Sequence, residues 1–256
     1  MSTEQVTLYG YPTSPYVLKV KCFLDFKKIP FHWEPVRPVK NESIKFTGQK
    51  KVPVLKIGDE WRTNSTDLGI WLDELYRERP ILGSDDIERE TILENDKWVS
   101  EALIAGRFRE ALDSDRPVAH TLNGWRLAAI VNDATPIPLH WRILWPAALK
   151  KAPFIKEIVD MLDREEPIAD MRIRHAREMV ARLKGGPFLG ARKEPSLADL
   201  SAFATLAFTY CAGFRGDFAV EREPAIMDWA KRMSTYLPEN PFLCDKRFLK
   251  RSLSTI

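Results

Sequence analysis

Short apolar runs and amphipathic stretches alternate over the first eighty residues. Val6 to Tyr9 is a mostly apolar run typical of a buried strand, whereas the apolar residues after Pro15 recur at helical spacing. Gly58-Asp59 separates two further strand-like runs and predicts a hairpin turn. In chain order we expect a strand at 6–9, a helix at 15–27, a strand at 31–36, a short helix at 42–46, strands at 52–57 and 61–63, and a helix at 66–77. The crossover between the first two strands and the later hairpin predict one small α/β domain.

The pattern changes beyond Pro80 and Gly83, where nearly every periodic stretch is helical. Helices are expected at 87–112, 120–132, 154–162, 168–183, 196–211 and 224–236. The stretch from Pro136 to Pro146 is interpreted as proline-interrupted filler between helices, and Lys246 to Arg251 as the solvated face of a last helix. We therefore predict two domains, an α/β domain over 1–80 and an all-helical domain over 84–256.

Charge and composition exclude several classes of protein. The 39 basic and 36 acidic residues nearly balance, which argues against a nucleic-acid partner. The polar start lacks the features of a signal peptide, and no apolar run approaches the roughly 18 residues that span a bilayer. Three scattered cysteines and four isolated histidines predict neither a disulfide framework nor a metal site. A cytoplasmic protein without a membrane or nucleic-acid partner is the expectation.

Three short motifs carry candidate chemistry. Ser14 is placed to cap the helix that Pro15 begins, and a hydroxyl beside free amides at a helix start suits a thiolate or another anion. Val52 precedes Pro53 at a strand start. A cis bond there would turn the Val52 peptide group outward. A trans bond would make Pro53 an ordinary proline of an edge strand. Ser65 is a plausible cap of the next helix. Each motif alone is explained nearly as well by a purely structural role.

Taken together, these motifs resemble the N-terminal domain of glutathione transferases. The matching run comprises Leu8-Tyr9-Gly10, Ser14-Pro15-Tyr16, Lys19-Val20, Val52-Pro53-Val54-Leu55, Asn64-Ser65, Leu68 and Trp71-Leu72. Pro187-Phe188-Leu189-Gly190 followed by Ser196-Leu197-Ala198-Asp199-Leu200 is similar to the buried capping-box helix of the same family. The resemblance is strong over 6–77 and 186–212. It implies a thioredoxin-like α/β domain followed by an all-α domain.

The resemblance also implies roles for individual residues in binding glutathione as a cosubstrate. Ser14 would donate a hydrogen bond to the glutathione sulfur and favour the thiolate. Val52, before Pro53, would pair with the cysteinyl backbone, and Ser65 would take the γ-glutamyl carboxylate. Asn64 stands where the family usually has Glu or Gln. Its shorter side chain is expected to hydrogen-bond the γ-glutamyl group less tightly. The remaining candidates are Lys40 or Lys51 for the glycyl carboxylate, and Tyr9, Tyr11 or Thr13 as alternatives to Ser14.

The expected activity is attack of the glutathione thiolate on a small hydrophobic electrophile by a homodimeric detoxification enzyme without a metal. A binding or scaffold protein that has lost the chemistry is one alternative, and a glutathione-dependent lyase or reductase is another. Serine at position 14 argues against the mixed-disulfide reductases, which carry cysteine there. The segment 114–150 is either filler or a lid and enlarged pocket, as in the β-etherase-like branch. Available aromatics for an electrophile pocket are Tyr16, Phe108, Trp141, Trp145 and Phe208.

Overall fold

The computed structural model describes residues 4–38, 41–112, 117–214 and 223–255. Its α/β part is a four-stranded sheet formed by β1 (Val6–Gly10), β2 (His32–Pro35), β3 (Val54–Ile57) and β4 (Glu60–Thr63). The strand order is β2-β1-β3-β4, with β1 parallel to β2 and the other two pairs antiparallel. This arrangement confirms the small α/β domain expected from the order of the elements and the thioredoxin-like fold that the resemblance implies.

The two faces of the sheet are covered differently because neighbouring strand residues point to opposite sides. Val6 and Leu8 of β1 lie in the main core with α1 (Pro15–Phe26) and α2 (Ser65–Leu75). Tyr9 lies on the opposite face, where it packs with a small cluster made by Val36, Ile44 and Val54. The segment Glu42–Thr47, expected as a short helix, forms a 3-10 helix over this second face.

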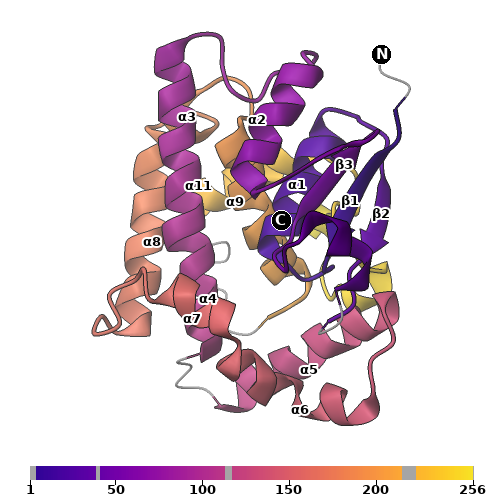
Figure 1. Cartoon of the computed structure of the whole chain (residues 1–256). Helices are drawn as coiled ribbons and strands as arrows, with labels where there is room; N and C mark the ends of the chain where they lie inside the picture. Colours follow the sequence, from indigo (N-terminus) through magenta and orange to yellow (C-terminus); the bar gives the residue numbers. More distant parts are fainter. Residues whose placement is uncertain (1–3, 39–40, 113–116, 215–222, 256) are drawn as a thin grey trace.

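The rest of the chain is mostly helical, as predicted (Figure 1). The long helix expected at 87–112 is present as α3 (Asp86–Trp98), a π-helical segment (Val99–Ile104) and α4 (Ala105–Leu112). The others are α5 (Pro117–Ala134), α6 (Leu139–Lys151), α7 (Pro153–Val159), α8 (Ile168–Leu183), α9 (Leu197–Cys211) and α11 (Pro224–Ser234). Within the described ranges, no helix combines the length and apolarity needed to cross a membrane.

Helix α9 is the centre of the helical part, and nearly all of its side chains are buried. It packs against α1 and α3, so it joins the α/β part to the helices. Its start is the predicted capping box. The Ser196 hydroxyl accepts from the Asp199 amide at 3.4 Å, and the Asp199 carboxylate accepts from the Ser196 amide at 3.0 Å. Asp199 also accepts from the Trp229 indole at 2.9 Å, which fixes α11 against this start.

Two predictions about the helical part were wrong. The proline-interrupted stretch forms helix α6, because Pro138 stands before its first turn and Pro146 packs against Gly124 of α5. The basic segment 246–251 is only a short 3-10 helix, Lys246–Phe248. Its backbone leaves the helical path because the amides of Lys250 and Arg251 donate to the carbonyl of Cys211, at the end of α9.

Candidate functional site

The start of α1 has the geometry predicted for a helix cap. Ser14 has extended backbone angles, and its hydroxyl oxygen accepts from the Val17 amide at 3.4 Å. Pro15 occupies the first helical position, and no acidic residue lies in the first turn. Because Ser14 is only half-buried and accepts through its oxygen, its hydroxyl hydrogen remains able to donate to a ligand.

The peptide bond between Val52 and Pro53 is cis, which is one of the two geometries left open by the sequence. Strand β3 begins at Val54, later than the expected residue 52. Among the described residues, neither the amide nor the carbonyl of Val52 has a backbone partner. Unpaired backbone groups beside a strand end suit an extended peptide ligand, which can add to them as a further strand would.

The start of α2 differs from the prediction by one residue. Asn64, not Ser65, caps the helix, since the Asn64 side-chain oxygen accepts from the Thr66 amide at 3.1 Å. Asn64 has a φ of +66°, in the left-handed region that asparagine tolerates better than most residues. Ser65 is the first helical residue, and its hydroxyl has no hydrogen-bond partner among the described residues. That hydroxyl is therefore available at a helix N-terminus, where negative charge is favoured.

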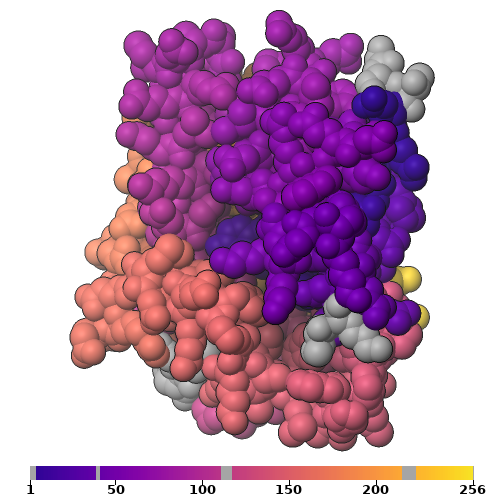
Figure 2. Space-filling model, viewed as in Figure 1, coloured from indigo at the N-terminus to yellow at the C-terminus, as the bar shows by residue number. Residues whose placement is uncertain are grey.

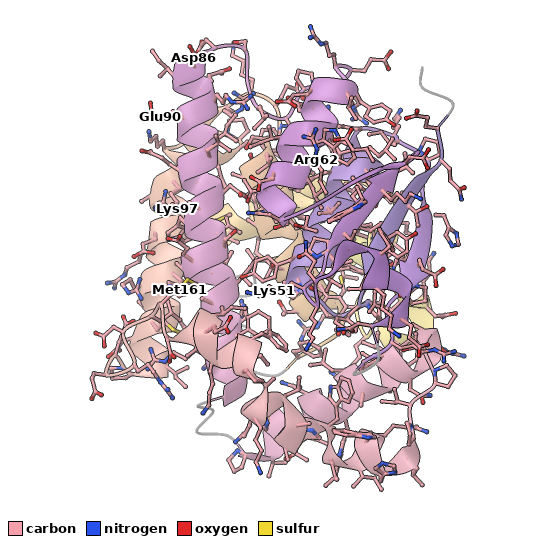
Figure 3. The ribbon with its side chains drawn as sticks, in the orientation of Figure 1. Lys51, Arg62, Asp86, Glu90, Lys97 and Met161 are labelled. Atoms are coloured by element: carbon pink, nitrogen blue, oxygen red, sulfur yellow. The ribbon has the colours of Figure 1, made fainter. Side chains whose placement is uncertain are left out.

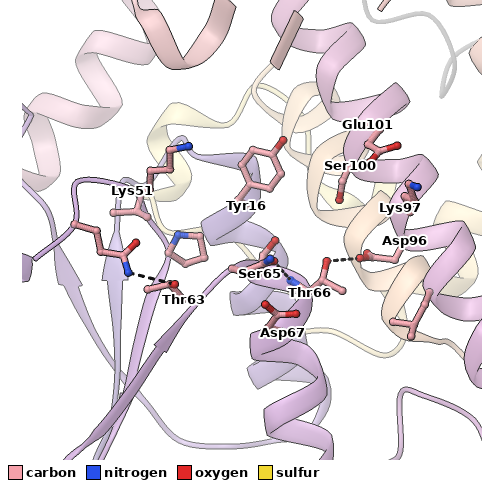
Figure 4. Close-up of a pocket in the computed structure, with 15 residues that line it drawn as sticks. Tyr16, Lys51, Thr63, Ser65, Thr66, Asp67, Asp96, Lys97, Ser100 and Glu101 are labelled. Carbon is pink, nitrogen blue, oxygen red and sulfur yellow. Dashed lines mark hydrogen bonds between the residues drawn. The ribbon is translucent and has the colours of Figure 1, made fainter. Parts of the chain in front are cut away.

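These motifs meet at a hollow of about 550 Å³ between the α/β part and helix α3 (Figures 2 and 4). The predicted residues Lys51, Val52, Pro53, Asn64 and Ser65 all line it. Ser14 is not among the lining residues. The opposite wall was not predicted from the sequence. It is formed by α3 and the π-helical segment, which contribute Leu93, Asp96, Lys97, Ser100 and Glu101. These residues are spaced three or four apart, so they share one face of the helix. The sequence does not show that this face borders the hollow, because that depends on α3 packing beside α2.

The other candidates lie apart from this hollow. Tyr9 lines a smaller hollow of about 330 Å³ beside Glu34 on the second face of the sheet, and the hydroxyl of Tyr11 donates to Asn41 at 2.9 Å. Thr13 is half-buried in the loop before α1. Lys40 lies outside the described residues. Lys51 is mostly exposed at the edge of the main hollow, with its ammonium 3.5 Å from the Glu157 carboxylate (Figure 3).

Of the five aromatics considered for an electrophile pocket, only Tyr16 lines the main hollow. Phe208 is buried in the core, whereas Trp141 is exposed on α6. Phe108 packs edge-on against Phe154, with ring centroids 6.2 Å apart. Burial, followed by the nearby charges of Asp96 and Glu101, raises the pKa of Tyr16 to about 12. Tyr16 therefore presents a protonated hydroxyl, which can donate a hydrogen bond into the hollow at neutral pH.

A buried ionic network lies under the hollow. The Lys19 ammonium is 2.8 Å from the Asp96 carboxylate, and both side chains are fully buried. Asp96 also accepts from the Thr66 hydroxyl at 2.6 Å (Figure 4) and from the Ser201 hydroxyl at 2.6 Å. Burial lowers the pKa of Lys19, and the neighbouring Asp96 opposes that change. The network thus joins α1, α2, α3 and α9 and holds the start of α2 against α3.

The hollow carries charges of both signs, with Lys51 and Lys97 on its edges and Asp67, Asp96 and Glu101 in its walls. Together with the unpaired Val52 peptide group, this lining suits a small peptide-like ligand that carries both ammonium and carboxylate groups. Over the described ranges, no group of three or more His, Cys, Asp or Glu side chains is arranged to hold a metal ion.

Comparison with known proteins agrees with this description. Residues 8–80 match the family model described as "Glutathione S-transferase, N-terminal domain". The structure is similar to β-etherase LigF from Sphingobium sp. strain SYK-6, with a TM-score of 0.62 and 21% identity over 90% of this chain and 95% of that chain. It is also similar to glutathione transferase Omega 3C from Trametes versicolor, with a TM-score of 0.61 and 16% identity over 91% and 86% of the two chains.

Two curated relatives match over shorter segments. The chain is 47% identical over 51 residues to prostaglandin E synthase 2 of Mus musculus, which is 20% of this chain. It is 34% identical over 64 residues to prostaglandin E synthase 2 of Danio rerio, which is 25% of this chain. These matches span only 13% and 17% of the relatives' own lengths.

The fold and the hollow define a protein with a thioredoxin-like domain and a mostly helical part, which meet at the hollow beside Val52 and Ser65. The family model over 8–80 and the structural neighbours identify this combination. Residues 8–80 match the N-terminal domain of glutathione S-transferases, and the structure has the fold of glutathione transferases.

Proposed function

We propose that the protein is a glutathione-dependent transferase that activates the glutathione thiol for attack on a small hydrophobic electrophile. The observation that carries this proposal is the meeting of the unpaired Val52 peptide group and the free Ser65 hydroxyl in one hollow. These two groups are spaced along the sheet edge and the start of α2, where an extended tripeptide could reach both.

In this proposal each part of glutathione has its own partner. The cysteinyl backbone pairs with the amide and carbonyl of Val52, and the γ-glutamyl carboxylate lies at Ser65, at the positive end of α2. Asn64 is already engaged as the cap of α2, so its contact to the γ-glutamyl group is weaker than that of a longer side chain. Lys51 faces the glycyl carboxylate from the exposed edge of the hollow.

Ser14 is the proposed partner of the sulfur. Its free hydroxyl hydrogen and the N-terminus of α1 both favour a thiolate over a thiol. Lowering a thiol pKa from about 8.5 by about two units requires only about 2.7 kcal/mol, which a hydrogen bond and a helix terminus can supply. Tyr16 is a competing donor, because it lines the hollow and keeps its proton.

Conjugation kinetics with Ser14→Ala and Tyr16→Phe separate these two donors. If Ser14 activates the thiol, Ser14→Ala lowers kcat/KM at neutral pH about ten- to a hundredfold, and activity recovers as the pH rises toward the free thiol pKa of about 8.5. Glutathione affinity should change little. Thr13→Ala tests the neighbouring alternative hydroxyl and should leave the pH profile in place. An unchanged profile in Ser14→Ala together with a shifted one in Tyr16→Phe would assign the role to Tyr16.

A binding or scaffold protein of the same fold is the alternative from another functional class. This alternative predicts that the protein is retained on immobilised glutathione but does not conjugate glutathione to any of a broad panel of electrophiles. Failure of the protein to bind immobilised glutathione would favour this alternative further. Because two matched relatives are named prostaglandin E synthase 2, formation of prostaglandin E belongs in the activity panel as a second candidate. A glutathione-dependent lyase reaction belongs there as well.

The assembly and the division of the chain are part of the same proposal. We infer a cytoplasmic homodimer, as is common among glutathione transferases, with a glutathione-binding domain over 1–80 and a helical domain over 84–256. Sedimentation equilibrium measures the oligomeric state directly. A monomer at micromolar concentration would contradict it without affecting the assignment of the glutathione site.

A further inference from the structure

Helices α5 and α6 form a hairpin at one end of the molecule (Figure 1). They cross closely at Gly124, where an added Cβ would lie 2.8 Å from Cγ of Pro146. The Trp125 indole donates to the carbonyl of Ile143 at 3.0 Å, and the His120 ring lies 3.3 Å from the carbonyl of Pro146. The two helices are therefore one packed unit, and their outward side chains belong to one surface.

That surface is unusually apolar for an exposed one. Val118, Leu122 and Trp125 follow each other at helical spacing along α5, and Leu139 and Ile143 do so along α6. The exposed large apolar side chains of the hairpin, between 41% and 69% exposed, are Val118, Leu122, Trp125, Leu139, Trp141, Ile143 and Leu144. Several exposed apolar side chains gathered on one hairpin mark an interaction surface more often than a free one. We call it the hairpin face.

The hairpin face is also cationic. No acidic residue occurs between Asp133 and Glu157, whereas Arg142, Lys150 and Lys151 of α6 are exposed there. Asp133 and Glu157 themselves lie against Arg247 and Lys51. The basic side chains of α6 therefore have no acidic neighbour in their own segment and are available to an anionic partner.

We propose that the hairpin face binds an anionic lipid surface, with its apolar side chains in the interfacial layer and its lysines at the headgroups. Exposed tryptophan, leucine and isoleucine beside lysine and arginine are the composition of a helix that lies in a membrane interface. A second copy of the chain would place one cationic face against another, which like charges disfavour. Neither of the two hollows described above is lined by residues of the hairpin. This proposal differs from the expectation of no membrane partner, and the experiment below decides between the two.

Co-sedimentation with vesicles tests the proposal, using phosphatidylcholine alone and an equal mixture of phosphatidylcholine and phosphatidylglycerol. The wild-type protein should bind the mixed vesicles and only weakly the neutral ones. Lys150→Glu/Lys151→Glu should lower the partition coefficient at least about thirtyfold, since each basic side chain near an anionic surface contributes about one kcal/mol. Leu139→Ser/Ile143→Ser should lower it at least about tenfold, because two apolar side chains leave the interface.

The matched control is Ile87→Ser/Ile173→Ser, which removes two exposed isoleucines on α3 and α8. It should bind vesicles like the wild type, and circular dichroism should show all variants folded. Absence of wild-type binding to the mixed vesicles overturns the proposal, as does equal loss in the control. Self-association of the wild type that Leu139→Ser/Ile143→Ser abolishes, without vesicle binding, would assign the face to a second copy. Retention on glutathione is a separate readout, so failure here leaves the proposed enzyme function intact.

Discussion

At the scale of single residues, Lys19 and Asp96 show how one wall of the hollow depends on a buried ion pair. Asp96 accepts from Lys19, Thr66 and Ser201, and the four side chains come from four helices. A buried ion pair contributes little net stability compared with an apolar replacement, but removing one partner leaves a charge without compensation. The network therefore acts mainly on where α2 begins relative to α3.

Lys19→Met should lower the free energy of unfolding by about 3 to 5 kcal/mol, because it leaves the buried Asp96 carboxylate without its cation. The double variant Lys19→Met/Asp96→Leu should be less destabilised than the sum of the two single variants. Urea unfolding measures both. The exposed pair Arg62 and Glu60 is the matched control, and Arg62→Met should cost less than about 1 kcal/mol. Equal costs for Lys19→Met and Arg62→Met would contradict the role given to the network.

The residues of the site were predictable from the sequence only where a local motif defines them. Ser14 before Pro15 and Ser196 before Asp199 each carry their signal within a few positions, and both predicted caps are present. The cap of α2 was misplaced because Asn64 and Ser65 are both good capping residues. Ser100 and Glu101 were not assigned to the site, and Tyr16 was only one of five candidate aromatics, because which residues face the hollow depends on how α3 docks.

At the scale of elements, hydrophobic periodicity predicted most helices and strands, and it failed where proline or hydrogen bonding overrides it. α6 forms although it contains Pro146, since the bare backbone of Gly124 gives the ring a place to pack. The end of the chain does not form the expected helix, since its amides close the end of α9. Residue periodicity does not distinguish the π-helical segment Val99–Ile104 from an ordinary α-helix, although π segments are frequent at functional sites.

Helix α8 contributes a pH-dependent element through His175. The ring is buried against α4, where a Cβ on Gly106 would lie 2.7 Å from its Cε1. Burial, aided by Arg174 and Arg107 and opposed by Glu178 and Glu166, lowers the His175 pKa to about 4. As the pH falls from about 6.5 to about 4, the unfolded chain therefore binds a proton that the folded chain does not, and stability present at neutral pH is lost.

His175→Gln should remove the part of the pH dependence of the free energy of unfolding that comes from His175. Between pH 7 and about pH 4.5, the wild type should lose about 2 to 3 kcal/mol more than the variant in its free energy of unfolding. Urea denaturation at the two pH values gives the comparison, and the slope with pH is the readout rather than the stability at either value. Parallel pH profiles for the two proteins would show that His175 titrates normally in the folded state.

At the scale of the whole molecule, one hydrophobic core runs from β1 through α1 and α9 to the last residues of the chain. The two parts therefore meet over a broad surface, and the hollow lies where that surface opens beside Val52 and Ser65. The sequence could predict the two parts separately, because each has its own periodic pattern. It could not predict the far wall of the hollow, which depends on the packing of α3 beside α2.

The crystal structure of the protein with glutathione tests the central claim most directly. We expect the cysteinyl backbone paired with the amide and carbonyl of Val52, the γ-glutamyl carboxylate at Ser65, and the sulfur within hydrogen-bonding distance of the Ser14 hydroxyl. A hollow that stays empty at saturating glutathione, or a tripeptide bound away from Val52 and Ser65, would contradict the account.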